Sequence, residues 1–349
     1  AHPDLFVFIS RFFVFPAKCT HPMFEEDLVT FGAAVVGKHA ERNLHRWAKK
    51  QMWHGFLPDP FDFEVQVADL GGLVQDVYMQ SAKPIPFMTS ALLPHEVFHT
   101  VFHHARDVWE YLLGDTEALL GFWQAAATAD DEWYRLHPVI AGTPPELCIP
   151  VGLHGDDAGV HGNEQVLVIS WNGVTFNRPT LDSRIVFTML KVAQIIPETM
   201  QRAYEVLKWS FDALASGRFP AADPWEKVFC EDYMPERARN AGQPLAERAD
   251  GQYYRGAFAE FRGDWKYLKE AFCFTEGYHK DDFICHRCMA RKQGISPGMW
   301  YSNFCRNAEH RASMVSNREF VEAYSRRSPL VNIPGMHITR IVFDLMHCM

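Results

Sequence analysis

Three short apolar runs between residues 148 and 196 constrain the fold most. They read CIPVGLHGDDAG, EQVLVISWNGV and RIVFTMLKVAQII, and they are rich in Val and Ile. Gly, Asp and Asn residues separate them. Short apolar runs bounded by turn-forming residues are typical of buried strands joined by tight turns. We therefore expect three consecutive strands to begin the second half of the chain.

The segments that follow extend this sheet. Pro197 opens a stretch with apolar residues at helical spacing, and Gly217 ends it as a C-cap. YYRGAFAEF then predicts a fourth strand, DWKYLKEAF a helix, and MHITRIVF a last strand. The predicted fold class is α/β (α+β), with a mixed sheet and flanking helices. Three leading strands followed by helix, strand, helix and strand is the order of the RNase H-like fold.

The N-terminal part of the chain has a different spacing of apolar residues. Residues from about 25 to 136 carry apolar side chains mostly at helical spacing, so we expect this region to be mostly helical. The apolar run LFVFISRFFVF is too short to span a bilayer, so no membrane partner is expected. The chain starts without Met and stops after an apolar run, so we expect a fragment of a longer protein. The predicted boundaries are 1–140 for the helical region, 141–349 for the RNase H-like region, 218–251 for a polar insertion, and 273–330 for a segment with cysteines, histidine and basic residues.

Charge and cysteine content limit the partners and the compartment. The net charge is −9, so any nucleic-acid contact must come from a local basic patch. Eight cysteines in 349 residues are too few for a disulfide scaffold, and several lie singly among apolar residues, which suits a reducing intracellular compartment. The candidate patch consists of Arg287, Arg291, Lys292, Arg306, Arg311, Arg318, Arg326 and Arg327.

Acidic residues follow two of the predicted strands. Asp156 and Asp157 lie in HGDDAG after the first strand, and Asp264 lies in FRGDW after the fourth. In an RNase H-like sheet these strand ends are neighbours, so Asp156 and Asp264 are expected to hold two Mg²⁺ or Mn²⁺ ions about 3.5–4 Å apart. Asp157 is a further candidate for binding these ions. The alternative is that GDD forms an ordinary turn.

A second set of residues has the spacing of a zinc site. Cys285, Cys288, Cys305 and His310 form C-x2-C-x16-C-x4-H, which suits a structural Zn²⁺, and His279 is a competing ligand. Such a site would hold together a segment too small for its own core. The alternative is that these cysteines are ordinary buried thiols.

These motifs together resemble a known family. An acid in GDW after a strand, an amphipathic helix, GYH and C-x-x-C are similar to the catalytic region of CACTA-type (En/Spm-like) DDE transposases. The stretch DLMH, Asp344 to His347, matches a downstream motif of that family, and the resemblance covers about residues 148–349. It implies that Asp156, Asp264 and Asp344 serve DNA cleavage and strand transfer. It also implies transposon ends and target DNA as partners, a nuclear location, and an assembly that can be oligomeric.

The chain also departs from that family. The family's third acid normally lies on a later helix, and the sequence ends before such a helix, so Asp344 is the remaining candidate. The transposase hypothesis therefore includes a chain that is incomplete or no longer active. The alternative hypothesis is a non-catalytic, zinc-stabilised nucleic-acid-binding protein derived from a mobile element.

The stretch PHEVFHTVFHH raises a third hypothesis. His95, Glu96 and His99 form H-E-x-x-H, the motif of zinc metalloproteases, with Glu117 as the candidate third ligand. Pro94 at the helix start puts His95 and Glu96 in the first turn, which is prone to fray. We favour a half-exposed helix face for these histidines over a metal site.

Overall fold

The computed structural model describes most of the chain after residue 57. Residues 25–57, the first part of the region predicted to be mostly helical, lie outside the described residues, as do His279, Asp344 and His347. The described residues are 58–69, 83–129, 131–159, 165–175, 184–274, 283, 285–292, 296–303 and 305–343.

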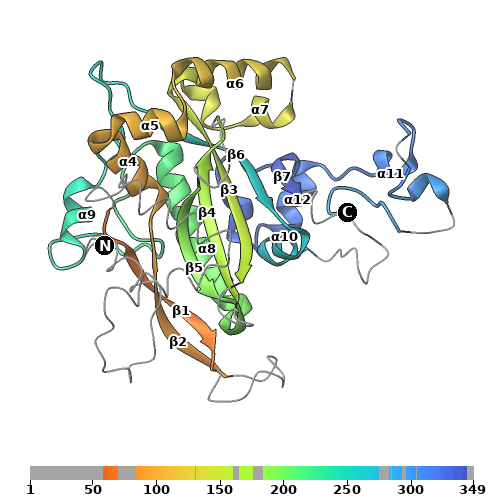
Figure 1. Ribbon diagram of the computed structural model, residues 1–349, viewed down its shortest axis with the longest axis horizontal. Helices are drawn as coiled ribbons and strands as arrows, with labels where there is room; N and C mark the ends of the chain where they lie inside the picture. The colour runs from red at the N-terminus through yellow and green to blue at the C-terminus, as the bar shows by residue number, and fades with distance from the viewer. Residues whose placement is uncertain are drawn as a thin grey trace.

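A mixed five-stranded sheet forms the centre of the molecule (Figure 1). The strand order is β5-β4-β3-β6-β7. Strand β4 pairs antiparallel with both β3 and β5, whereas β6 pairs parallel with both β3 and β7. The predicted mixed α/β class is thus confirmed. The strands are β3 (Cys148–Gly159), β4 (Gln165–Gly173), β5 (Ile185–Lys191), β6 (Arg255–Gly263) and β7 (Ile341–Phe343).

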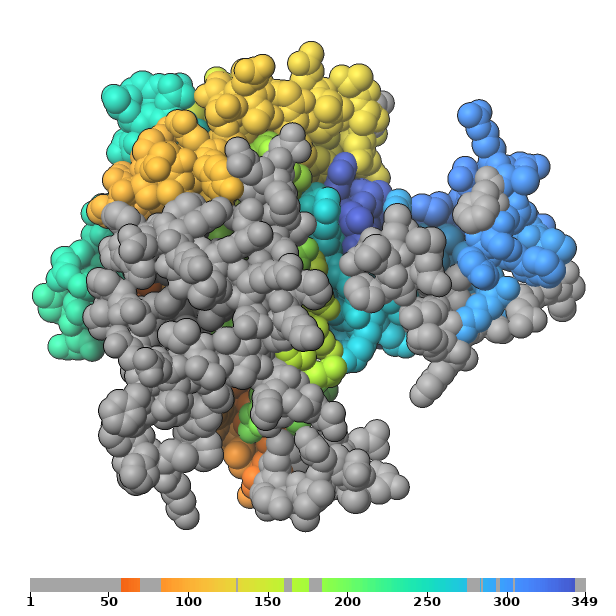
Figure 2. Space-filling model, viewed as in Figure 1, coloured from red at the N-terminus to blue at the C-terminus, as the bar shows by residue number. Residues whose placement is uncertain are grey.

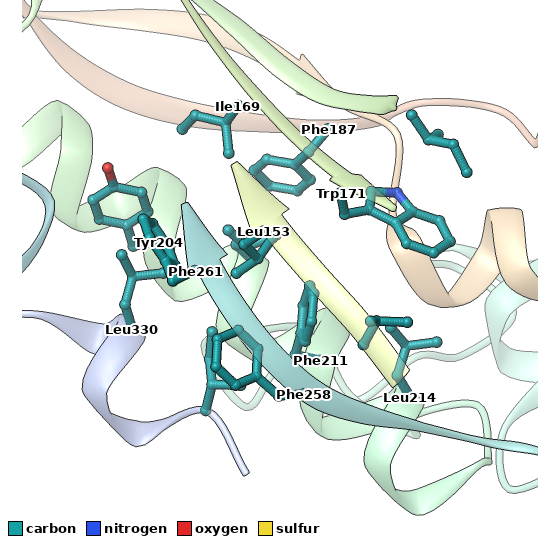
Figure 3. Packing of buried hydrophobic residues seen from close by; sticks show 14 of the residues in the cluster. Leu153, Ile169, Trp171, Phe187, Tyr204, Phe211, Leu214, Phe258, Phe261 and Leu330 are labelled. Atoms are coloured by element: carbon teal, nitrogen blue, oxygen red, sulfur yellow. The ribbon is translucent and has the colours of Figure 1, made fainter. Parts of the chain in front are cut away.

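Helix α8 (Pro197–Ser216) packs along the sheet and supplies much of the core. Pro occupies its first turn, and Gly217 ends it with a left-handed φ of 69°, a conformation that glycine adopts without steric cost. Figure 3 shows its buried side chains, among them Phe211, lying against side chains of β3 and β6 such as Leu153 and Phe258. The predicted helix from Pro197 to the Gly217 cap is confirmed.

Helix α10 (Trp265–Phe272) begins directly after β6 and packs against the ends of β3 and β6. The polar insertion contains α9 (Pro235–Asn240), and the segment after α10 contains α11 (Glu309–Ala312) and α12 (Asn317–Tyr324). None of the helices in the described part of the chain has the length and apolar character that a membrane span needs. Single 3-10 turns lie at Ile140–Gly142, Pro145–Leu147, Val192–Gln194, Pro297–Met299, Pro329–Asn332 and Ile338–Arg340.

The described N-terminal part is not purely helical. Strands β1 (Phe61–Ala68) and β2 (Pro84–Ala91) form an antiparallel hairpin where we predicted mostly helix. The reason is visible in β1, FDFEVQVA, whose first residues alternate between buried apolar and exposed polar side chains, the period of a half-buried strand. Four helices follow the hairpin: α4 (Pro94–His104), α5 (Arg106–Leu113), α6 (Thr116–Thr128) and α7 (Glu132–Leu136).

Candidate acidic site at the ends of two parallel strands

Two acidic residues that are 108 positions apart lie at neighbouring strand ends. Gly155 of β3 is in register with Gly263 of β6, and the two strands run parallel. Paired strands are about 4.8 Å apart, so the backbones of these two glycines stand side by side. The residue after each glycine is an acid: Asp156, within β3, and Asp264, which follows β6 as the N-cap of α10. The fold thus brings the two predicted site residues to neighbouring positions of the backbone.

Two glycines make this end of the sheet compact. A Cβ on Gly155 would lie 1.9 Å from Cζ of Tyr267, and a Cβ on Gly263 would lie 2.6 Å from Cδ1 of the same ring. The ring therefore covers both backbones, and the Tyr267 hydroxyl lies 3.2 Å from that of Tyr204 in α8. Burial raises the pKa of Tyr267 well above its ordinary value. Because Tyr267 fills the space over the glycines, α10 can begin immediately where β6 ends.

Asp264 has a structural task in addition to any chemical one. It is the N-cap of α10, and its Oδ1 accepts a hydrogen bond from the backbone N–H of Tyr267 at 2.6 Å. A capping carboxylate satisfies one of the otherwise unpaired N–H groups of a first helical turn. A metal ion held by Asp264 would therefore be bound through the second carboxylate oxygen.

Asp157 lies on the opposite face of β3 from Asp156. Successive side chains of a strand alternate between faces, so Asp157 shares the face of Gly155, where α10 packs. There Lys266 Nζ donates to Asp157 Oδ2 at 2.6 Å, and this hydrogen bond raises the pKa of Lys266. The structure thus gives Asp157 a cationic partner on α10, and a role in binding metal ions would compete with this pair.

A cationic group also lies on the face of the sheet that carries Asp156. His154, two residues earlier in β3, shares this face by the same alternation. Its Nδ1 accepts a hydrogen bond from Arg184 Nη1 at 2.8 Å. Neither Arg184 nor Lys266 was singled out from the sequence, because nothing in the local pattern links them to β3.

Among the described residues, two of the three predicted acids of this site are present, Asp156 and Asp264. Asp344 follows Phe343, which is in register with Gly263, but Asp344 lies outside the described residues. Among the residues that are described, no group of three or more His, Cys, Asp or Glu side chains could hold a metal ion. Asp156 and Asp264 therefore form a pair of candidate ligands, to which further ligands would have to be added.

The predicted zinc residues are only partly brought together. Cys288 Sγ lies 3.9 Å from His310 Nδ1, and the hydrogen bond from Cys288 lowers the pKa of Cys285 below its ordinary value. His310 Nε2 lies 3.0 Å from the carbonyl oxygen of Asn303. In the tautomer with the proton on Nε2, this nitrogen donates to that oxygen, and the lone pair of Nδ1 faces Cys288 Sγ. Cys305 is exposed, and no contact joins it to this group in the described segments.

The H-E-x-x-H residues of α4 have other partners. His95 Nδ1 lies 2.8 Å from the Ser210 hydroxyl, and Glu96 accepts hydrogen bonds from Arg237 at 2.6 and 2.9 Å. His99 Nδ1 lies 2.6 Å from the carbonyl oxygen of Leu245. These contacts engage the three residues that a metalloprotease would use. Glu96 and His99 line a cavity of about 320 Å³.

The predicted half-exposed histidine face is wrong for His95. Its side chain is buried, and burial lowers its pKa to about 3. The cause is tertiary: α4 lies against α8, where Trp209 meets the imidazole ring edge-on at 5.1 Å between centroids. A neutral histidine with a hydroxyl partner is stable in such a place.

Comparisons of the chain with models of protein families, with curated proteins and with solved structures gave no match. What the site does must therefore be inferred from its geometry. Its decisive feature is the pair of acids that the parallel pairing of β3 and β6 brings to one end of the sheet.

Proposed function

We propose that the chain is an RNase H-like, DDE transposase-like region that cleaves and joins DNA phosphodiester bonds with two Mg²⁺ or Mn²⁺ ions. The observation that carries the proposal is the position of Asp156 and Asp264, which follow paired glycines at the ends of parallel strands. Carboxylates that a fold holds close together repel one another, and a cation between them removes that repulsion. Hard oxygen ligands are those that Mg²⁺ and Mn²⁺ prefer.

The topology supports the RNase H-like assignment. Three strands joined antiparallel are followed by helix α8 and by two more strands, of which β6 pairs parallel with β3 and β7 pairs parallel with β6, which gives the order β5-β4-β3-β6-β7. This is the strand order and polarity of the RNase H-like sheet. In that arrangement the first and fourth strands are neighbours, which accounts for the adjacency of the two acids.

In this proposal each side chain has a defined task. Asp156 and the second oxygen of Asp264 hold the cations, while the cap to Tyr267 keeps the Asp264 carboxylate in place. A bound pair of divalent ions supplies an activated water or 3′-hydroxyl and stabilises the departing oxygen. The Lys266–Asp157 pair joins α10 to the end of β3 and so limits the separation of the two acids.

We further propose Asp344 as a third ligand, on its place in the sequence alone. The chain passes from Phe343, paired in register with Gly263, directly to Asp344. A third carboxylate would complete a set of the kind that two-metal enzymes use. The DNA partners and the nuclear location belong to this same proposal.

Metal binding and cleavage of a labelled DNA duplex test the proposal together. We expect the chain to bind Mn²⁺ in calorimetry and to cleave the duplex with Mg²⁺ or Mn²⁺. Asp156→Asn should abolish both activities. Asp264→Asn should abolish both while it retains the fold, because Asn is as good an N-cap as Asp. Asp344→Asn should weaken both.

Another capping aspartate provides a matched control. Asp115 accepts from the N–H of Ala118 at 2.8 Å at the start of α6, so Asp115→Asn makes the same chemical change at a cap without a proposed metal role. This variant should behave as wild type. Absence of Mn²⁺ binding in the wild-type chain, or wild-type behaviour of Asp156→Asn, would contradict the proposal.

The 3.9 Å contact between Cys288 and His310 favours a second candidate, a zinc-stabilised nucleic-acid-binding protein without turnover. Metal analysis separates it from a metalloprotease. Zinc content should fall with Cys288→Ala and remain with His99→Ala. In this second case Asp156→Asn should leave DNA binding unchanged. A zinc-free wild-type chain would contradict the zinc proposal.

A further inference from the structure

The segment 285–314, which we call the basic lobe, has a charge opposite to that of the whole chain. It contains five basic residues and one acid, Glu309, in a protein whose net charge is −9. Figure 2 shows this segment, in blue, standing out at one side of the molecule. A positive region that projects from a negative body attracts a polyanion locally. The basic residues are Arg287, Arg291, Lys292, Arg306 and Arg311.

Large hydrophobic side chains are exposed on the same lobe. Tyr301 is 52% exposed and Trp300 is 37% exposed. Met289 and Met314 are also exposed, at 48% and 46%. Hydrophobic side chains that gather on one surface mark an interaction site more often than isolated ones do. Aromatic rings next to arginines provide both stacking surfaces and positive charge.

The backbone holds the aromatic and basic residues next to each other. The backbone N–H of Arg291 donates to the carbonyl oxygen of Met299 at 2.9 Å. The backbone N–H of Tyr301 donates to the carbonyl oxygen of Arg291, also at 2.9 Å. The Arg291 guanidinium also lies over the Phe283 ring, 4.3 Å from its centroid. These bonds fix Trp300 and Tyr301 against the strand-like stretch that carries Arg291.

We infer that the basic lobe binds an unpaired polynucleotide strand. Exposed bases would stack on Tyr301 and Trp300, while Arg306 and Arg311, both exposed, would contact the phosphates. A duplex keeps its base faces stacked inside the helix and offers only the phosphates. An acidic peptide would satisfy the charge but carries no bases that could stack on the exposed parts of these rings. The inference does not depend on the acidic pair Asp156 and Asp264.

Fluorescence anisotropy with a labelled oligothymidylate tests the inference on the whole chain. Tyr301→Ala and Trp300→Ala should each weaken binding about 5- to 160-fold, the range for loss of one stacked base. Tyr301→Phe keeps the ring and should bind as wild type. Leu136→Ala, a change at a side chain that is 66% exposed on α7, should have no effect. The wild-type chain should bind the oligothymidylate more tightly than a duplex of equal length.

Salt dependence gives a readout that does not rely on the aromatic variants folding. Arg306→Gln and Arg311→Gln should each reduce the slope of log K against log salt by about 0.7, the value for one phosphate contact with a single strand. Arg239→Gln is the control, because that side chain is 63% exposed on α9, away from the basic lobe. An oligouridylate should bind similarly to the oligothymidylate, since both offer unpaired bases and phosphates.

Several outcomes would overturn the inference. These are wild-type affinity of a Trp300→Ala, Tyr301→Ala double variant, equal or tighter binding of the duplex, and displacement of the oligothymidylate by polyglutamate at equal charge. A chain that binds the strand but neither binds Mn²⁺ nor cleaves DNA would refute the proposed function and leave this inference standing.

Discussion

The ion pair between Glu96 and Arg237 gives the sharpest prediction about stability. It joins α4 to α9 across 141 positions, with two hydrogen bonds of 2.6 and 2.9 Å. The side chains are 10% and 19% exposed, so little solvent screens the pair. Burial raises the pKa of Glu96, and the charge and hydrogen bonds of Arg237 offset part of that rise. Arg237 thus favours the ionised form of Glu96 in the folded chain.

The change to make is Arg237→Gln. Removing one partner of a buried pair costs about 3–5 kcal/mol, and we expect the lower end, about 3 kcal/mol at pH 8, because the pair borders a cavity of about 320 Å³. Without Arg237 the folded pKa of Glu96 rises further above its unfolded value. Between the unfolded and the folded pKa of Glu96, the folded variant holds a proton that the unfolded chain releases. The free energy of unfolding of the variant therefore falls as pH rises through this range. The stability lost through Arg237→Gln should be smaller at pH 5 than at pH 8.

Urea titrations at pH 5 and pH 8, followed by near-ultraviolet circular dichroism, measure this difference. The double variant Glu96→Leu, Arg237→Met should recover most of the loss, since it leaves no unpaired charge. Arg239→Gln, whose side chain is 63% exposed and 3.6 Å from Glu236, should cost less than about 1 kcal/mol. A loss below about 1 kcal/mol for Arg237→Gln, or an equal loss at both pH values, would refute the reasoning.

Three further predictions follow from the packing. Gly155→Ala should destabilise the chain by about 1–3 kcal/mol in urea titrations, because the new Cβ would lie 1.9 Å from Tyr267 Cζ. Gly159→Ala is the control: a Cβ there meets nothing within 4 Å, so stability should change by less than about 0.5 kcal/mol. NMR titration should find His95 neutral at pH 5, since burial lowers its pKa to about 3; a midpoint near pH 6.5 would contradict this. Burial raises the pKa of Cys148 to about 12, so iodoacetamide at pH 8 should spare it in the folded chain and modify it after denaturation.

Much of the sheet could be predicted because its signals are local. The run CIPVGLHGDDAG coincides with β3, Cys148–Gly159, and the predicted helix runs from Pro197 to the Gly217 cap as observed. Apolar runs, prolines and glycines act within a few residues, so a sequence displays them directly. The β1–β2 hairpin lies in the region predicted to be mostly helical. The alternation in FDFEVQVA is its local signal, but that run is short and lies between longer segments with helical spacing.

The partners within and around the site could not be predicted, because they join distant parts of the chain. Arg237 meets Glu96 across 141 positions, and Lys266 meets Asp157 across 109. Which of many charged residues becomes a partner depends on how helices and strands pack. The same holds for His95, which the helical pattern of α4 assigned to a half-exposed face and which the packing of α8 buries.

The hydrogen bond from Tyr267 to Asp264 has an evolutionary consequence. An aspartate that starts a helix is preserved by selection for folding, independently of any role in the proposed function. Asp156 lies within a strand and starts no helix, so under the proposed function selection for catalysis would act on it more directly. In related chains, substitution at Asp156 would under that proposal mark a loss of activity earlier than substitution at Asp264.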